Sequence, residues 1–294
     1  MMGRIIYLDG RFVAEEDALI SVFDHGFLYG DAVYEGMRCH EGKVFRLAEH
    51  LKRLYESAKT IRLEIPFSIE EFQELHLEAI RRNNFQNAYI RTIVSRGYGH
   101  LGMDPRKCPR PTVVIIPSDI HIYPRELYET GMSVIIPSTR KSRPDSLTHR
   151  VKTTSNFVNI MAKMAASRQG FAEAVMLSSE GYVADATVDN VFIIKDGELL
   201  TPPKHVGIIA GITRNAILKM AKELGFSARE EILLPHDLYN ADECFLTGTA
   251  AGIMPVVRVD ERVIGNGHPG DLTHQLMIAY WELVKRDGVP VYTK

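Results

Sequence analysis

The apolar residues of this chain switch repeatedly between a period of two and a period of about 3.6, which restricts the fold to a mixed α/β (α+β) class. Residues 5–8 and 12–13 are predicted to pair as a hairpin, because Asp9-Gly10 between them supplies the positive φ of a tight turn. Residues 46–62 are predicted to form an amphipathic helix. Its apolar side chains lie four, three, four and three positions apart: Leu47, Leu51, Leu54, Ala58 and Ile61.

Both patterns continue along the rest of the chain. Ser68 and Glu71 form a capping-box pattern that starts a helix running to about residue 83. A helix over about 156–169 is closed by Gly170. Further elements are helices from Thr213 to Gly225 and from Asp271 to Gly288, and strands at 88–95, 112–116, 132–136, 172–177, 182–183, 191–194 and 199–200.

A domain boundary is predicted between Pro117 and Gly131, where Pro124 and scattered polar residues interrupt the periodic pattern. With 294 residues, the chain is long enough for one large core or two medium ones. We therefore expect a small N-terminal domain over residues 1–120, an interdomain loop over 121–131 and a larger C-terminal domain over 132–294.

The composition is that of a globular protein, with 45% hydrophobic and 24% charged residues. The 35 basic and 37 acidic residues leave a formal net charge of -2, which argues against nucleic acid as a partner. Apolar stretches such as 206–212 are much shorter than the roughly 20 residues that span a bilayer, and the N-terminal residues lack the apolar core of a secretion signal. We expect a cytoplasmic protein without a membrane partner.

The three cysteines, Cys39, Cys108 and Cys244, are widely separated and form no CxxC pair. This spacing suggests neither a disulfide framework nor a zinc site. Three reduced, buried thiols and no metal site are expected.

Four segments of the second half could hold a phosphorylated aromatic cofactor, and each also has a purely structural explanation. Gly211-Ile212-Thr213 leads into a helix whose first N–H groups can bind an anion, or Thr213 only caps that helix. Residues 247–252 are small enough to bring backbone amides close to a ligand, or they form a tight loop. Lys152 precedes a helix, where it could be a nucleophile or a solvated surface lysine. Asp185, if buried, needs a cation, which could be a pyridine nitrogen or a nearby arginine.

The first half contributes further candidates. Arg53 on the first helix could clamp a phosphate or lie on a solvated face. Strand alternation places Tyr89 and Arg91 on one face, where they could receive a carboxylate or form an exposed sheet surface. Aromatic residues around Asp24-His25-Gly26 could line an apolar pocket or belong to the core.

Taken together and in order, these segments resemble the branched-chain amino acid aminotransferase family, which belongs to the class IV pyridoxal-phosphate-dependent aminotransferases of fold type IV. The resemblance runs nearly from end to end. It rests on SVFDHGFLYGDAVYEGMR (21–38), VFRLAEHLKRL (44–54), AYIRTIVSRGYGHLGMDP (88–105), GYVADATVDNVFIIKDGELLTPP (181–203), GITRNAILKMAKELG (211–225) and ADECFLTGTAAGIMPV (241–256).

The resemblance implies a smaller N-terminal α+β domain, a larger C-terminal mixed domain, pyridoxal 5′-phosphate between them, and at least a homodimer. Lys152 matches the Schiff-base lysine, Arg53 the phosphate-binding arginine, and Asp185 the acid that faces the pyridine nitrogen. The other phosphate-contacting positions are matched by Ile212, Thr213 and Thr249.

The resemblance also implies the substrate site. Thr249 and Ala250 match the turn whose amides receive the α-carboxylate. Tyr89 and Arg91 match a pair that accepts the far carboxylate of glutamate or 2-oxoglutarate. The remaining matches are the pocket aromatics Tyr29, Tyr34 and Tyr128, and Arg38 near the pocket entrance.

Three positions depart from the family pattern. Asp185 stands where glutamate is usual, Phe157 stands where a tyrosine usually bonds the phenolic oxygen of the cofactor, and Gly252 replaces an acid. The resemblance implies transamination of leucine, isoleucine and valine with 2-oxoglutarate, so amino acids and 2-oxo acids are the expected small-molecule partners. A D-amino acid aminotransferase or an aminodeoxychorismate lyase of the same fold, and a non-catalytic cofactor-binding protein, stay as alternatives.

Overall fold

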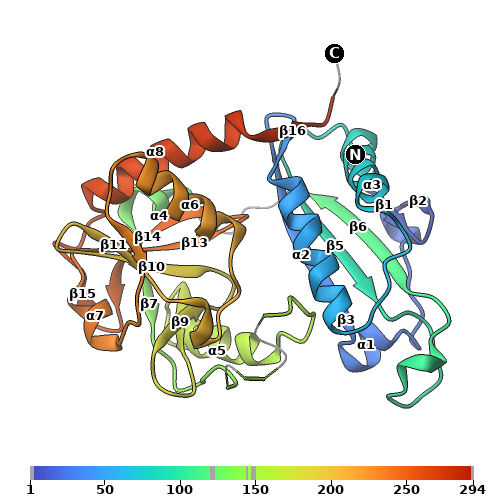
Figure 1. Cartoon of the computed structure of the whole chain (residues 1–294), viewed down its shortest axis with the longest axis horizontal. Coiled ribbons are helices and arrows are strands. Elements are labelled where there is room, and N and C mark those ends of the chain that lie inside the picture. Colours follow the sequence, from blue (N-terminus) through green and yellow to red (C-terminus); the bar gives the residue numbers. More distant parts are fainter. Residues whose placement is uncertain (1–2, 120–122, 144, 147–149, 293–294) are drawn as a thin grey trace. The chain divides into compact units, whose positions relative to one another are not determined.

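The computed structural model describes residues 3–119, 123–143, 145–146 and 150–292, and they form two compact units (Figure 1). Unit 1 comprises residues 1–120, 151–155 and 284–294, and unit 2 comprises residues 121–150 and 156–283. These bounds differ from the predicted ones in two later segments that belong to unit 1. The reason is strand pairing, because Thr153 bridges to Val33 and residues 288–290 pair with residues 43–45.

Unit 1 is built on a seven-stranded sheet in the order β16-β4-β3-β5-β6-β1-β2. Its strands are β1 (Ile5–Leu8), β2 (Arg11–Ala14), β3 (Ala32–His40), β4 (Lys43–Phe45), β5 (Ala88–Ser95), β6 (Thr112–Ser118) and β16 (Gly288–Pro290). All neighbouring strands are antiparallel. The longest ladder joins β3 to β5, from Ala32 opposite Ser95 to Cys39 opposite Ala88.

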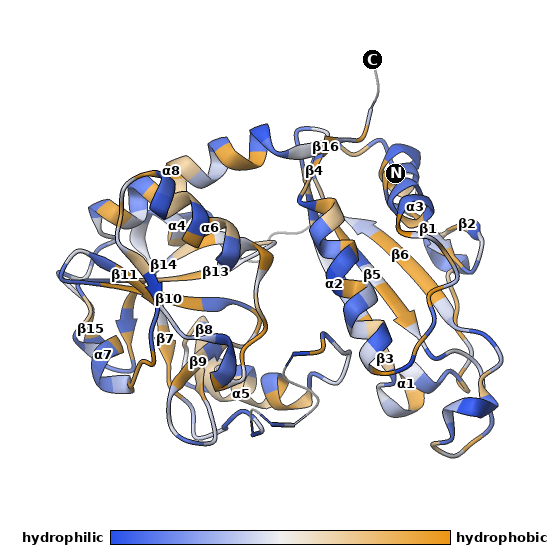
Figure 2. Ribbon diagram, in the orientation of Figure 1, coloured by the Kyte–Doolittle hydropathy of each residue, from blue (hydrophilic) through white to orange (hydrophobic). Residues whose placement is uncertain are grey.

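Two long helices pack on this sheet, α2 (Leu47–Thr60) and α3 (Ile69–Arg82), and α3 starts with the predicted capping box at Ser68 and Glu71. One core cluster contains apolar residues of both helices together with Val33, Met37, Ile90 and Val94 of the sheet. Figure 2 shows β5 and β6 as largely apolar, whereas both helices also carry hydrophilic residues. The shorter helices of unit 1 are α1 (His25–Tyr29), η1 (Glu15–Asp17) and η2 (Pro105–Lys107).

Alternation along β3 therefore divides its residues between two environments. Val33, Glu35 and Met37 share the face that packs on the helices, and Tyr34, Gly36 and Arg38 share the other face. This division determines on which side of the sheet each polar side chain of β3 lies.

Unit 2 contains a nine-stranded sheet in the order β12-β11-β10-β13-β14-β7-β8-β9, with β15 paired to β14. Its strands are β7 (Met132–Ile135), β8 (Glu173–Leu177), β9 (Val183–Ala186), β10 (Asn190–Lys195), β11 (Glu198–Thr201), β12 (Ala228–Glu230), β13 (Glu243–Gly248), β14 (Gly252–Val259) and β15 (Arg262–Val263). Because β9 pairs with both β8 and β10, the path β10-β13-β14-β7-β8-β9 closes on itself. All six of these strands contribute to one core cluster.

The helices of unit 2 are α4 (Glu126–Thr130), α5 (Phe157–Arg168), η4 (Lys204–Val206), α6 (Ile212–Glu223), α7 (Pro235–Tyr239) and α8 (Asp271–Arg286), the last of which ends within unit 1. Helix α4 lies inside the segment predicted as an interdomain loop, so that prediction is wrong for residues 126–130. The helix packs on β14, so its side chains cover part of that strand. No helix in the described part of the chain is long and apolar enough to cross a membrane.

Candidate active site

Lys152 lies in a short segment that unit 1 holds against β3 and α2. The Tyr34 N–H donates to the Lys152 carbonyl oxygen over 3.0 Å, and Val33 and Thr153 form an antiparallel bridge. The Lys152 N–H donates to the Ser57 hydroxyl of α2 over 3.3 Å. Because these contacts fix the backbone, the lysine side chain starts from a defined point.

The amine of Lys152 lies beside Tyr34. Nζ is 3.4 Å from the Tyr34 hydroxyl oxygen and 4.4 Å from the centroid of its ring, which is a cation–π distance. The residue is partly buried. The alternative of a fully solvated surface lysine is therefore wrong, and the position suits an amine that must act as a nucleophile.

One face of β3 and β5 gathers aromatic and basic side chains. The register places Gly36 opposite Arg91, and Arg38 opposite Tyr89. The Arg91 guanidinium carbon lies 4.5 Å from the ring centroid of Tyr34 and 5.4 Å from that of Tyr89. A Cβ at position 36 would overlap the Tyr89 hydroxyl, so glycine allows Tyr89 to lie across β3. The predicted pair of Tyr89 and Arg91 thus belongs to a cluster that also contains Tyr34.

Arg53 is held on the opposite face of β3 by a buried acid. The Glu35 carboxylate accepts from Arg53 Nε over 2.6 Å and from Nη2 over 2.9 Å, and His50 Nδ1 lies 2.8 Å from Glu35 Oε2. Burial acts to raise the pKa of Glu35, but Arg53 and His50 beside it lower that pKa to about 2. The acid is therefore ionised at neutral pH, and Arg53 does not lie on a solvated helix face.

In unit 2, Asp185, Asn190 and Thr247 form a row across three strands. Asp185 of β9 pairs with Asn190 of β10, which pairs with Thr247 of β13. Directly paired residues of antiparallel strands project to the same face, so the three side chains are neighbours. The Thr247 hydroxyl is buried and has no hydrogen-bond partner among the residues that the structure describes. The row therefore contains an unsatisfied hydroxyl that could form a hydrogen bond with a bound polar group.

Asp185 already has a cationic partner, which is a lysine. Lys141 Nζ lies 2.6 Å from Oδ1 and 2.8 Å from Oδ2 of Asp185, and each side chain is only 8% exposed. A structural ion pair is therefore present, with Lys141 in place of the arginine considered from sequence. A ring nitrogen at this acid would have to share the carboxylate with Lys141.

Helix α6 begins next to the same row. Asn190 Nδ2 donates to the Ile209 carbonyl oxygen over 2.9 Å, and a Cβ on Gly211 would overlap Asn190 Oδ1. Gly211 is the N-cap of α6, and no described side chain caps this helix. The N–H groups of the first turn, which includes Ile212 and Thr213, are thus left to a ligand or to water.

The turn between β13 and β14 lies next to Thr247 of this row, which is the last but one residue of β13 in the ladder. Gly248 pairs with Gly252, so residues 249–251 form the turn, and the Tyr128 hydroxyl donates to the Ala251 carbonyl oxygen over 2.9 Å. Unit 2 therefore combines an uncapped helix start, a turn of small residues, a buried hydroxyl and an acid. These N–H and hydroxyl donors and the acceptor carboxylate fit a ligand that carries a phosphate and a basic ring nitrogen.

The structure distributes the predicted site residues between the two units. Unit 1 contains Tyr29, Tyr34, Arg38, Arg53, Tyr89, Arg91 and Lys152, and unit 2 contains Tyr128, Asp185, Ile212, Thr213, Thr249 and Ala250. Tyr29 of α1 uses its hydroxyl to accept from the Gly102 N–H over 2.8 Å. It is therefore anchored on the 97–103 loop.

Sequence reasoning missed three residues that hold the predicted ones. Glu35 and His50 hold Arg53, and Lys141 holds Asp185. His50 lies three positions before Arg53, one helical turn away, so helix periodicity could have paired them. No spacing signal connects Lys141 to its acid, because the two residues belong to different segments of the chain.

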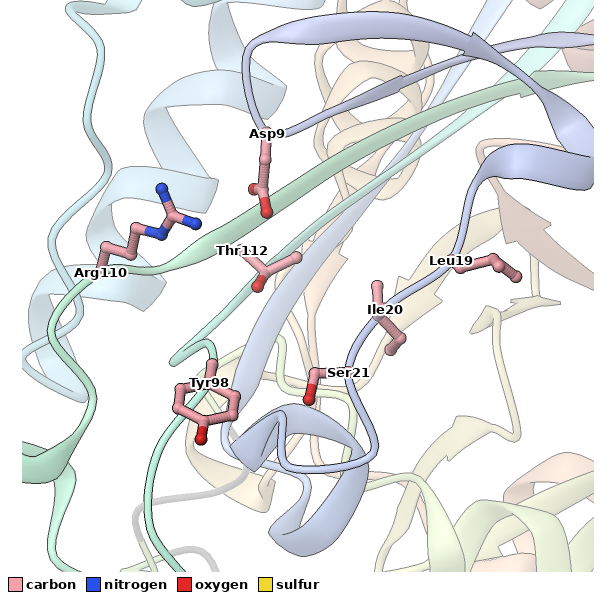
Figure 3. A pocket seen from close by; sticks show the side chains of 7 residues that line it. All are labelled: Asp9, Leu19, Ile20, Ser21, Tyr98, Arg110 and Thr112. Atoms are coloured by element: carbon pink, nitrogen blue, oxygen red, sulfur yellow. The ribbon is translucent and has the colours of Figure 1, made fainter.

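A hollow elsewhere on unit 1 is separate from this group of residues. It is lined by Asp9, Leu19, Ile20, Ser21, Tyr98, Arg110 and Thr112 (Figure 3). None of the predicted site residues is among them, so the hollow is not part of the candidate site.

Comparison with known proteins agrees with this arrangement. The chain matches the family model Amino-transferase class IV over residues 32–259. It is 46% identical to a putative branched-chain-amino-acid aminotransferase of Methanocaldococcus jannaschii, over 98% of this chain and 99% of the relative. It is 37% identical to the branched-chain-amino-acid aminotransferase of Escherichia coli (strain K12), over 95% and 92% of the two chains.

Solved structures give the same result. The crystal structure of the Escherichia coli branched-chain amino acid aminotransferase superposes with a TM-score of 0.93 at 35% identity, covering 96% of this chain and 95% of that one. The branched-chain aminotransferase of Thermoproteus uzoniensis with norvaline superposes with a TM-score of 0.92 at 32% identity, covering 98% and 99%. The fold and the matched segment are those of a class IV aminotransferase. Within that class, the chain belongs to the branched-chain amino acid aminotransferase family, which confirms the predicted family and fold type.

Proposed function

We propose that this protein transfers amino groups between the branched-chain L-amino acids leucine, isoleucine and valine and 2-oxoglutarate, with pyridoxal 5′-phosphate as its cofactor. The observation that carries the proposal is Lys152, whose backbone is fixed by β3 and α2 and whose amine lies beside Tyr34. The names of the relatives support the substrate class. Solved relatives that contain pyridoxamine 5′-phosphate or N-(5′-phosphopyridoxyl)-L-glutamate support the cofactor.

The residues that match the family pattern would hold the cofactor. Lys152 would bind it covalently through Nζ, and Asp185 would face its ring nitrogen. Its phosphate would be bound by Arg53, Ile212, Thr213 and Thr249. When bound, the cofactor supplies an electron-withdrawing ring that makes the Cα proton of the substrate acidic.

The protein would then supply proton transfer and positioning. The free amine of Lys152 would act at Nζ as the general base on the Cα proton of the substrate, and would later return a proton as the general acid. The charge of Asp185 would favour a protonated ring nitrogen, and that nitrogen would share the carboxylate with Lys141. Each of these groups is fixed by its neighbours before the substrate arrives, which lowers the cost of reaching the reactive geometry.

A single substrate pocket must accept both an apolar side chain and a carboxylate. The amides of the turn at Thr249 and Ala250 would receive the α-carboxylate, which both substrates share. The Arg91 guanidinium lies within cation–π distance of the rings of Tyr34 and Tyr89, so one surface would offer aromatic area to a branched side chain and a guanidinium to the far carboxylate of glutamate. Tyr29, Tyr128 and Arg38 would complete the pocket.

Steady-state assays of the purified holoenzyme with L-leucine, D-alanine and aminodeoxychorismate, run side by side, test the proposed substrate class. The expected result is transamination of L-leucine with 2-oxoglutarate at a kcat/KM roughly 100 times that with D-alanine or more, a difference of about 2.7 kcal/mol in transition-state binding. Turnover of D-alanine alone, or release of pyruvate from aminodeoxychorismate alone, would contradict the proposal and support the other enzymes of this fold.

We further propose that the protein acts as at least a homodimer. Unit 1 exposes a group of apolar side chains, namely Leu19, Val22, Phe23, Phe27, Tyr98, Leu101 and Met103. The two segments that carry them are in contact, since the rings of Phe23 and Tyr98 are 6.0 Å apart. An apolar surface of this kind favours association. Light scattering coupled to gel filtration should give a mass of twice 33.2 kDa or a multiple of it, and a monomer would contradict the proposal.

A cytoplasmic location is also part of the proposed function. The three cysteines are free thiols, which suits a reducing compartment. Cys39 and Cys244 are buried as predicted, but Cys108 is only half-buried, so the prediction is wrong for that residue. Cell fractionation followed by an activity assay would test the location, and recovery of the activity in the membrane or secreted fraction would contradict it.

A further inference from the structure

We propose that Glu35 and His50 are positioning residues that set the orientation of the Arg53 guanidinium for the cofactor phosphate. This inference rests on the proposed function for the ligand of Arg53. The contacts among the three side chains themselves belong to unit 1 and are observed directly.

Glu35 holds the guanidinium at one edge through two donors. The distances are 2.6 Å from Arg53 Nε and 2.9 Å from Nη2 to the two carboxylate oxygens. A guanidinium bound at both atoms has a fixed plane, because rotation about its terminal bonds would break one of the two hydrogen bonds. The Glu35 side chain is 0% exposed and that of Arg53 is 16% exposed, so water competes little for these donors.

His50 fixes the acid in turn. Its Nδ1 lies 2.8 Å from Glu35 Oε2, and its Nε2 is buried without a hydrogen-bond partner among the described residues. Burial lowers the pKa of His50, so the ring is neutral at neutral pH. A neutral ring with its proton on Nδ1 donates to Glu35 and leaves only a lone pair on Nε2, which leaves no N–H donor unpaired.

Glu35 projects from the face of β3 opposite the candidate substrate face, and His50 contacts it there. Neither residue therefore acts in the chemistry directly. Alternation in β3 sends Tyr34, which touches Lys152 Nζ, to one face and Glu35 to the other. On that second face Glu35 has the apolar neighbours Val33 and Met37. A buried ion pair seldom stabilises a fold more than apolar side chains of the same volume would, so stability alone does not account for an acid here.

A simpler role for Glu35 predicts the opposite effect on the phosphate. If Glu35 acted only as a nearby negative charge, it would weaken phosphate binding, and its removal would tighten that binding. If Glu35 positions Arg53, its removal weakens phosphate binding because the guanidinium loses its fixed plane. The sign of the change in Glu35→Gln therefore separates the two roles.

The experiment titrates the full-length apoprotein with pyridoxal 5′-phosphate and, separately, with pyridoxal, which lacks the phosphate. We expect Glu35→Gln to raise the Kd of pyridoxal 5′-phosphate about tenfold, the size of one lost charge-assisted hydrogen bond. The Kd of pyridoxal should change less than about twofold. Glu49→Gln is the matched control, since Glu49 lies on α2, the helix that carries Arg53, is 48% exposed and pairs with Arg46 at the surface. It should change neither constant.

A double-variant cycle tests whether Glu35 acts through Arg53. Arg53→Lys keeps the charge but cannot be held at two atoms, so it should raise the Kd of pyridoxal 5′-phosphate by a similar factor. Glu35→Gln should then add less than about twofold in the Arg53→Lys background. Circular dichroism checks the fold. If Glu35→Gln does not fold, Glu35→Asp replaces it, with a rise in the same direction expected.

Two results would overturn the inference. The first is an unchanged or lower Kd of pyridoxal 5′-phosphate in the Glu35 variant, and the second is full additivity of that variant with Arg53→Lys. Failure of the proposed function looks different. In that case Arg53→Gln would also leave the ratio of the Kd of pyridoxal to the Kd of pyridoxal 5′-phosphate unchanged, whatever the Glu35 variant does.

Discussion

Replacing Lys141 by methionine removes the ammonium group that contacts both carboxylate oxygens of Asp185, at 2.6 and 2.8 Å. Each side chain is only 8% exposed, so water cannot take the place of the lost cation. Removing one partner of a buried pair costs about 3–5 kcal/mol. In a protein of this size each kcal/mol lowers the melting temperature by roughly 2–4 °C. We therefore expect the Lys141→Met apoprotein to melt roughly 10 °C below its parent.

Urea unfolding of the apoproteins at pH 7 measures this loss. Lys195→Met is the matched control, because it removes an exposed pair with Asp242 whose atoms are 3.6 Å apart, and it should cost less than about 1 kcal/mol. The double variant Lys141→Met with Asp185→Asn removes both buried charges and should recover most of the loss. Added pyridoxal 5′-phosphate should stabilise Lys141→Met more than the parent, because its ring nitrogen can replace the cation. A loss in Lys141→Met no larger than that in Lys195→Met would refute the reasoning.

The remaining predictions concern three other side chains. Arg91→Leu should raise the KM for glutamate and 2-oxoglutarate about tenfold or more and leave that for leucine nearly unchanged; equal changes for both substrates would remove Arg91 from carboxylate recognition. Phe157→Tyr adds a donor for the phenolic oxygen of the cofactor, so the pH midpoint of the visible absorption change should fall by about one unit or more, and an unmoved midpoint would show that position 157 does not reach that oxygen. Burial lowers the pKa of His76 from 6.5 to about 4. The unfolded chain therefore takes up a proton before the folded chain does, and the free energy of unfolding should decrease as the pH falls from about 6.5 towards 4. In urea unfolding, His76→Gln should reduce this dependence of the free energy of unfolding on pH. An unchanged dependence would show that other groups cause it.

The parts of the fold that were predictable from sequence are those set by neighbouring residues. Asp9 and Gly10 have φ of 46° and 92°, as a tight turn between β1 and β2 requires. Ser68 and Glu71 form both bonds of the capping box that starts α3. The strand predicted at 88–95 is β5 with the same bounds. The interactions that decide the turn and the capping box span only a few residues, and the eight residues of β5 are enough to show strand alternation in the local sequence.

Elements that depend on distant partners could not be predicted in this way. Helix α4 has five residues, too few to show a helical period, and β16 has three. Residues 151–155 follow the predicted domain boundary in sequence, yet they pair with β3 of unit 1. Local patterns contain no information about such pairings, because the partner segment is more than a hundred residues away.

The same limit applies to the candidate site. The family resemblance identified Lys152, Arg53 and Asp185 as single positions, but not what holds them. Lys141 lies 44 residues from Asp185 in sequence, and Glu35 lies 18 residues before Arg53. These supporting contacts come from the tertiary structure, and they determine the orientation and charge of the groups that the motifs indicate.

The central claim is that Lys152 binds the cofactor, and borohydride trapping followed by peptide mass spectrometry tests it most directly. Reduction of the holoenzyme should leave the phosphopyridoxyl group on the peptide that contains Lys152 and on no other. Lys152→Ala should lose the label, the visible absorption band and transamination, whereas the control Lys195→Ala, which removes only an exposed ion pair, should keep all three. A label on another lysine, or transamination that persists in Lys152→Ala, would contradict the account.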